Sequence, residues 1–365
     1  MKKILTFIIL LFLFIPKTYA STNTAESYIL MDMNTNRVLL SKNKDNPMLI
    51  ASITKIMTSI IVIENTDLSN IITVDDSILK AYGSGIYIQI GEEMTVKDML
   101  YGLMLRSGND AAVMLATYIS NSEEEFVKLM NDKAASLGMK NTHFNNASGL
   151  DEKNGNYSTS YDMALLTSYA MKNETYREIV KTKKYTSKTN YKTYIWTNKN
   201  KLLNYDYITG GKTGYTEKAK RTLVSTASIN NMNLVVVTLK DSDDWNTHTS
   251  LYNYAKENYT SYKVLNKSKF NIEEDNYFKG NLIIKNDVYI PFKKEETSSL
   301  ISHIKLYKLK NYKDNDVVGV NQILYKGKVI YEENIYIELK DIKKESLLDK
   351  IRRLFKWLTI SGHSL

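Results

Sequence analysis

The order of strand-like and helix-like segments between residues 27 and 259 constrains the fold more than any other feature of the sequence. Apolar runs at residues 27–31 and 37–40 flank a short polar turn, and a second pair of runs, at 222–229 and 233–239, flanks Asn230-Asn231. Apolar spacing typical of helices occurs at residues 52–64, 96–105, 110–119, 123–137 and 249–259. We therefore expect an α/β (α+β) domain with a helical cluster, in which both ends of the segment share one antiparallel sheet.

The pattern changes after about Phe270. Short alternating apolar runs around turns occupy residues 267–340, which predicts a small all-β domain. Residues 341–365 instead place large apolar side chains on one helical face and lysine and arginine side chains on the other. This pattern predicts an amphipathic helix that binds an anionic membrane surface, and a terminal helix packed on its own protein is the alternative.

The first 20 residues have the pattern of a secretory signal peptide. Lysines at positions 2 and 3 precede an apolar run from Ile4 to Ile15, and Thr18-Tyr19-Ala20 has small residues where a signal peptidase cleaves. The run of 12 residues is shorter than the roughly 20 that a membrane-spanning helix needs, so we expect cleavage after Ala20 and not a retained anchor. The first domain then spans residues 21–262, and the exported protein is expected at the outer face of the cytoplasmic membrane.

Composition narrows the chemistry that the chain can perform. The 365 residues include no cysteine and four scattered histidines, so we expect no disulfide, no thiol chemistry, no metal site and no cofactor. The formal net charge of +9 indicates anionic surroundings. Export favours wall polymers or lipid headgroups as those surroundings and argues against nucleic acid.

Ser52 and Lys55 form the first candidate catalytic pair. They stand three positions apart at the start of a predicted buried helix, so both side chains lie on one face within reach of each other. A lysine surrounded by apolar side chains loses part of its preference for the charged form and can take the serine proton as a general base. A lone Ser-x-x-Lys sequence also arises by chance, so the pair indicates a catalytic site only together with further motifs.

Two further motifs supply candidate partners. Ser107-Gly108-Asn109 stands between two predicted helices, where the serine can relay a proton and the asparagine amide can hold a substrate carbonyl. Lys212-Thr213-Gly214 brings a cation and a hydroxyl for a substrate carboxylate, and its glycine lets a strand edge approach the substrate closely. Taken alone, each motif is also explained as a turn or a glycine-rich loop.

The three motifs together, in this order and at wide spacing, match the set described for penicillin-binding proteins and class A β-lactamases. The sequence resembles the low-molecular-mass penicillin-binding proteins, which are serine D-alanyl-D-alanine carboxypeptidases. The likeness covers nearly the whole chain and includes "IASITKIMTS", "GEEMTVKDMLYGLMLRSGNDAAVMLA", "NTHFNNASGLD", "YSTSYDMALL", "TNKNKLL" and "ITGGKTGYTEKAKRTLVSTA". It implies a penicillin-binding-protein/β-lactamase-like transpeptidase domain, followed by that family's β domain and amphipathic tail.

The resemblance also implies catalytic roles. Ser52 attacks the carbonyl between two D-alanines of a peptidoglycan stem peptide, with Lys55 as the base. Ser107 passes a proton to the leaving amine, helped by Lys212. β-Lactams, which mimic the D-alanyl-D-alanine end, are then expected to be covalent inhibitors that acylate Ser52.

Substrate-binding roles follow from the same resemblance. Asn109 orients the substrate amide, and Lys212 and Thr213 hold the terminal carboxylate beside Gly214. The backbone N–H groups of Ser52 and Tyr215 form the oxyanion hole.

Some positions depart from the family pattern. Ile50 stands where many members have proline, Asn156-Tyr157 where many have histidine, and Lys220 where glycine is frequent. "DSDDWNTHTS" has no arginine at a position where many members have one. "EKAK" and "DDW" instead resemble a subgroup found in spore-forming bacteria, so the departures concern substrate fit and deacylation and leave the nucleophile unchanged.

Other functions stay open from the sequence. A DD-endopeptidase would use the same motifs on cross-links. A β-lactamase would need a second carboxylate base between the second and third motifs, where there is no clear Glu-x-x-Leu-Asn and where Glu123-Glu124-Glu125 resembles a solvated helix start. An inactive wall-binding protein is the alternative of another class, and the intact motifs argue against it.

Overall fold

The computed structural model describes residues 24–151, 155–270, 278, 280–307 and 309–339. The described residues divide into two compact units, those up to residue 261 with 291–293 and those of 262–290 with the residues from 294 onward. The predicted signal peptide and the predicted tail helix lie outside the described residues. Within the described ranges, no helix is long and apolar enough to cross a membrane.

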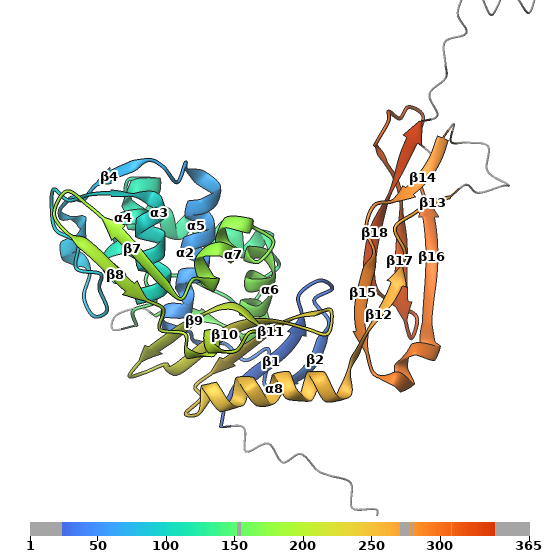
Figure 1. Ribbon diagram of the computed structural model, residues 1–365, viewed down its shortest axis with the longest axis horizontal. Helices are drawn as coiled ribbons and strands as arrows, with labels where there is room; N and C mark the ends of the chain where they lie inside the picture. The colour runs from blue at the N-terminus through green and yellow to red at the C-terminus, as the bar shows by residue number, and fades with distance from the viewer. Residues whose placement is uncertain (1–23, 152–154, 271–277, 279, 308, 340–365) are drawn as a thin grey trace, which may run out of the picture. The chain divides into compact units, whose positions relative to one another are not determined.

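A five-stranded antiparallel sheet forms the centre of the first unit, in the order β2-β1-β11-β10-β9 (Figure 1). Its strands are β1 (Ser27–Asp32), β2 (Val38–Lys42), β9 (Ile208–Thr216), β10 (Lys220–Ile229) and β11 (Met232–Leu239). β1 pairs with β11 from Ser27 opposite Leu239 to Asp32 opposite Leu234. The expectation that both ends of this segment share one antiparallel sheet is confirmed, and β9 is an edge strand.

Both faces of this sheet are buried, because its strands alternate between two hydrophobic cores. Val235 and Val237 face the core that contains residues of α2, α6 and α7, whereas Leu234 and Val236 face the core that contains residues of α8. Figure 1 shows α6 and α7 on one side of the sheet and α8 on the other. The helices are α2 (Lys55–Asn65), α3 (Val96–Tyr101), α4 (Asn109–Ser120), α5 (Glu123–Ser136), α6 (Ser160–Ala170), α7 (Glu174–Lys181) and α8 (Asp244–Asn258).

Two helix boundaries differ from the sequence predictions. The helix predicted at 96–105 continues beyond α3 as a π-helical turn, Gly102–Arg106, and ends at Ser107 in the left-handed conformation. The helix predicted to begin at residue 249 begins at Asp244, because Trp245 and the buried His248 extend its inner face toward the N-terminus. Additional elements are α6, α7, β3 (Met48–Leu49), β4 (Ile71–Thr73), β5 (Glu93–Thr95), β6 (Tyr157–Ser158), β7 (Lys184–Lys188) and β8 (Thr193–Thr197).

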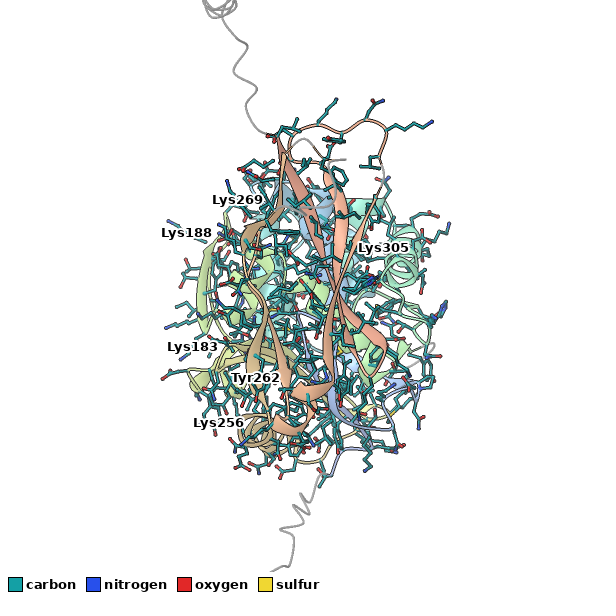
Figure 2. All side chains as sticks on the ribbon, turned by 90° about the vertical axis from the view of Figure 1, so that its right-hand side faces the viewer. Lys183, Lys188, Lys256, Tyr262, Lys269 and Lys305 are labelled. Carbon is teal, nitrogen blue, oxygen red and sulfur yellow. The ribbon has the colours of Figure 1, made fainter. Side chains whose placement is uncertain are left out.

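The second unit has an antiparallel sheet in the order β13-β14-β18-β17-β16. Its strands are β13 (Ser268–Phe270), β14 (Gly280–Ile284), β16 (Leu300–Leu306), β17 (Val317–Tyr325) and β18 (Lys328–Leu339), and β12 (Thr260–Leu265) pairs with β15 (Val288–Phe292) in a second sheet. Leu282, Ile284, Val318, Ile335 and Ile337 form its buried core. Lys269 of β13 and Lys305 of β16, labelled in Figure 2, are exposed and contribute to the basic charge of the chain.

Candidate active site

Ser52 lies on a short 3₁₀ helix, Ala51–Thr54, that leads directly into α2. Lys55 Nζ donates a hydrogen bond to Ser52 Oγ at 3.2 Å, so the three-residue spacing brings the two groups together. The same Nζ also donates to Asn109 Oδ1 at 2.7 Å and to the Ser148 carbonyl at 2.5 Å. These contacts use the three donors of an ammonium and fix the amine beside the serine hydroxyl.

The Ser148 carbonyl reaches Lys55 because the next residue is glycine. Gly149 has a φ of +89°, and a β-carbon there would lie 2.0 Å from the carbonyl oxygen of Ala51. The turn is closed by Asn146, whose Oδ1 accepts a hydrogen bond from the Gly149 N–H at 2.7 Å. The loop can therefore pass directly against the Ser52 helix.

Lys55 is completely buried, and this burial changes its acid–base behaviour. Desolvation is the main cause that lowers the pKa of Lys55 to about 7, and the positive charge of Lys199 lowers it further. The carboxylate of Asp110 opposes the shift. Near neutral pH a substantial fraction of Lys55 is therefore uncharged and able to accept a proton.

Lys212 and Ser107 form a second buried pair. Lys212 Nζ donates to Ser107 Oγ at 3.0 Å and to the Thr213 carbonyl at 2.7 Å. Burial, and then the charges of Lys55 and Lys199, hold the pKa of Lys212 well below its usual range. The positive φ of Ser107 is 64°, which turns the chain between the π-helical turn and α4 and leaves this hydroxyl beside Lys212.

Asn109 has protein partners at both ends of its amide. Its Oδ1 accepts the bond from Lys55, and its Nδ2 donates to the Tyr82 carbonyl at 2.6 Å. The side chain is buried, so it holds Lys55 in place. One N–H of the amide has no partner among the described residues, and its use by a substrate carbonyl stays a prediction.

Gly214 lets β9 approach the Ser52 helix. A β-carbon at Gly214 would lie 2.4 Å from Thr222 Oγ1 and 3.0 Å from the Ser52 backbone nitrogen. The Lys-Thr-Gly motif is therefore part of a strand edge and not a loop, and its last residue lies against the nucleophile. Tyr215 follows at the rim with 61% of its surface exposed.

A cavity of about 350 Å³ opens beside β9 and collects residues from all three motifs. Ser52, Ser107, Thr213, Gly214 and Tyr215 line it, whereas Lys55 and Lys212 lie buried behind their serines. Asn109 lines a second cavity of about 340 Å³. The structure thus brings the eight predicted residues into one region of the first unit.

Five further cavity residues were not among the predicted site residues: Ser84, Lys199, Arg221, Asp244 and Trp245. Lys199 lies in "TNKNKLL", and Asp244 and Trp245 lie in "DDW". The sequence analysis quoted both segments for the resemblance but did not assign these residues to the site. Arg221 lies in "ITGGKTGYTEKAKRTLVSTA", which was also quoted without assigning this residue to the site, and the pairing of β10 with β9 places it there.

Asn156 belongs to the Asn156-Tyr157 pair that stands where a histidine was expected from the resemblance, and its side chain has a structural role. Its Nδ2 donates to Thr54 Oγ1 and to the Asn146 carbonyl, both at 2.9 Å, and its Oδ1 accepts the Asn145 N–H at 2.7 Å. The buried amide therefore ties the loop that ends in Ser148 to the helix that carries Ser52.

Residues 16–243 match the family model described as D-alanyl-D-alanine carboxypeptidase, peptidase S11. The chain belongs to this family. D-alanyl-D-alanine carboxypeptidase DacF of Bacillus subtilis is 40% identical over 228 residues, which are 60% of this chain and 58% of that relative. D-alanyl-D-alanine carboxypeptidase DacA of Haemophilus influenzae is 30% identical over 376 residues, covering 94% of this chain and 90% of that relative.

Two solved structures of similar proteins show the same fold. Penicillin-binding protein 5 from Haemophilus influenzae matches with a TM-score of 0.70 and 27% identity, covering 87% of this chain and 97% of that one. A mutant of the Streptomyces K15 DD-transpeptidase matches with a TM-score of 0.61 and 33% identity, covering 64% of this chain and 97% of that one. The first match extends well beyond the part covered by the family model.

Proposed function

We propose that this protein is a serine D-alanyl-D-alanine carboxypeptidase that removes the terminal D-alanine from peptidoglycan stem pentapeptides. The observation that carries the proposal is the 3.2 Å hydrogen bond between Ser52 and the fully buried Lys55, beside the cavity at the β9 edge. Family membership supports the same reaction. Since peptidoglycan lies outside the cytoplasm, the enzyme acts on the wall side of the membrane.

Acylation begins at Ser52. The neutral amine of Lys55 takes the proton from Ser52 Oγ as the oxygen attacks the carbonyl carbon between the two D-alanines. The oxyanion of the tetrahedral intermediate is bound by the backbone N–H groups of Ser52 and Tyr215, and each such donor stabilises it by about 3 kcal/mol. Gly214 allows these two backbones to lie close enough to serve one oxygen atom.

The second motif completes the departure of D-alanine. Ser107 donates its proton to the leaving nitrogen as the C–N bond breaks, and Lys212, which donates to Ser107 Oγ, replaces that proton. An ester between Ser52 and the shortened peptide remains. Water then attacks the ester, and the Ser52 hydroxyl is restored.

Penicillins acylate the enzyme by the same reaction, because the strained lactam amide presents a carbonyl to Ser52.

Among the described residues that line the cavity, Asp244 is the only carboxylate, and it is ion-paired with Arg221 at 2.5 Å. The cavity therefore offers no free carboxylate base to speed hydrolysis of the ester, which favours a carboxypeptidase over a β-lactamase. Glu123 lines the second cavity, not this one, and its Oε1 accepts the Ala147 N–H at 2.9 Å.

The experiment is an incubation of the purified protein with a stem pentapeptide and, separately, with a labelled penicillin. We expect release of D-alanine and a covalent label that mass spectrometry of a digest assigns to Ser52. Ser52→Ala is the control and should lose both activities. A label on another residue, or D-alanine release by the alanine variant, would show that the nucleophile is wrongly assigned.

We further propose that residues 341–365 hold the enzyme on the outer face of the cytoplasmic membrane. Their sequence places about six large apolar side chains on one face, and full burial of each contributes about 1.5–3 kcal/mol. The basic face adds attraction to anionic lipid that weakens with salt.

Vesicle flotation tests the tail. Full-length protein should float with anionic vesicles, whereas a chain that ends at Asp341 should not float and should still be acylated by penicillin. Equal flotation of both proteins, or of neither, would reassign the tail to packing against the protein.

A further inference from the structure

Arg221 lines the active-site cavity but belongs to none of the three motifs. It lies on β10 directly opposite Tyr215 of β9. Because side chains alternate along a strand, Arg221 leaves the same face of the sheet as Tyr215 and Thr213, which line the same cavity. The arginine therefore extends the cavity wall beyond the Lys-Thr-Gly motif.

Two residues at the start of α8 hold the guanidinium. Arg221 Nη2 donates to Asp244 Oδ1 at 2.5 Å, and the Asp244 side chain is only 3% exposed. The guanidinium carbon lies 5.5 Å from the centre of the Trp245 ring. A side chain that is already ordered loses less conformational entropy when a ligand binds, so this arrangement favours Arg221 as a binding group.

The guanidinium has capacity for a second anion. It has five N–H donors in a planar fork that matches the two oxygens of a carboxylate. Within the part of the chain that the structure describes, Asp244 is its only hydrogen-bond partner, and Nε is buried without one. The side chain is 40% exposed, so a ligand in the cavity can reach it.

The two lysines of the catalytic motifs are less suited to hold a constant positive charge. Lys55 and Lys212 are buried and donate to Ser52 and Ser107. Burial and the charge of Lys55 lower the pKa of Lys212, so its ammonium loses its proton more readily than an exposed lysine would. A guanidinium, in contrast, stays protonated in proteins.

The reaction places an anion close to Arg221. The scissile carbonyl lies at Ser52, and the terminal carboxylate is one residue further along, a span of about 3.5 Å. Ser52 and Arg221 line one cavity of about 350 Å³.

We propose that Arg221 binds the terminal α-carboxylate of the substrate and thereby selects peptides that end in a free carboxyl group. This inference rests on the proposed function, because it assigns the residue that recognises one end of that substrate. Asp244 and Trp245 are positioning residues, since they contact the arginine and hold its fork toward the cavity.

The test compares two peptides, diacetyl-lysyl-D-alanyl-D-alanine and the same peptide with a C-terminal carboxamide. Loss of a hydrogen bond to a charged group predicts that Arg221→Gln lowers kcat/KM for the carboxylate peptide about 10- to 100-fold. The variant should leave turnover of the carboxamide peptide near the wild-type value. Lys220→Gln is the matched control, because it removes an exposed cation from the position directly before Arg221 on β10, outside the cavity lining. It should change kcat/KM for neither peptide.

The preference for the carboxylate peptide, which is the ratio of the two kcat/KM values, decides whether Arg221 binds the terminal carboxylate. An Arg221→Gln variant that keeps the wild-type preference, or that slows both peptides equally, overturns the assignment. Arg221→Lys keeps a cation but loses the planar fork, so it should retain part of the preference. It replaces Arg221→Gln in the comparison if the glutamine variant does not fold. A wild-type protein that releases neither D-alanine from the carboxylate peptide nor D-alanine amide from the carboxamide peptide would contradict the proposed function itself, a result distinct from an unchanged preference.

Discussion

Burial of the Lys55 amine predicts a specific pH dependence for acylation by penicillin. The neutral amine is the active form, so the rate should increase as pH rises. With a pKa of about 7, about half of the molecules are active at pH 7, whereas the ordinary value of 10.5 would leave only about 1 in 3,000 active. We therefore expect the acylation rate to be half-maximal near pH 7 and to level off above about pH 8.

Substitution of Lys199 tests this pH dependence. After burial, its charge is the next cause of the lowered pKa of Lys55. Lys199→Gln removes this repulsion, so the pKa of Lys55 should rise and the profile should move to higher pH, and each tenfold change in the proton affinity of Lys55 corresponds to about 1.4 kcal/mol. Because Lys199 also lines the cavity, the position of the profile is the measured quantity and the plateau rate is not.

Stopped-flow measurement with a fluorescent penicillin between pH 6 and 9.5 gives the profile. Lys201→Gln is a suitable control, since it removes an exposed lysine two positions away that does not line the cavity. A wild-type rate that still rises tenfold per unit at pH 9 would show that Lys55 keeps an ordinary pKa. An identical profile for Lys199→Gln would show that the two ammonium groups do not interact.

Two further predictions concern residues that shape the site. Gly214→Ala places a β-carbon 2.4 Å from Thr222 Oγ1 and 3.0 Å from the Ser52 nitrogen, so the penicillin acylation rate should fall at least about tenfold, and an unchanged rate would mean that the strand yields without cost. Asn156→Ala leaves buried groups, including the Thr54 hydroxyl, without their partner, so the free energy of unfolding measured by denaturant titration should decrease by about 1–3 kcal/mol, and a smaller change would show that water replaces the amide.

Local spacing explains why part of the site could be predicted from the sequence. Ser52 and Lys55 are three residues apart, and any helical conformation brings them together. Ser107 and Lys212 are 105 positions apart, so their contact depends on how β9 packs against the helices, and only the resemblance to a known family indicated it. The second contact of Asn109, to the Tyr82 carbonyl, had no sequence signal of either kind.

Contacts between distant segments explain why other residues of the site were not predicted from the sequence. Arg221 reaches the site through the pairing of β10 with β9, and Asp244 reaches it through the packing of α8 below the sheet. The sequence analysis interpreted "DDW" only as a likeness to a subgroup of the family, and its polar residues did not indicate the first turn of a helix. Residues of this kind are found only when strand pairing is known.

The pairing of β1 with β11 has a consequence for how the protein is made. Ser27 pairs with Leu239, so β1, which can pair with β2 early, meets its second partner β11 only after about 200 more residues have been synthesised. Closing so long a loop makes the sheet a slow, late-forming structure. The oxyanion hole needs β9 on that sheet against the Ser52 helix, so a nascent chain that has not yet reached β11 has no working site, and the enzyme becomes active only after β1 and β11 have paired.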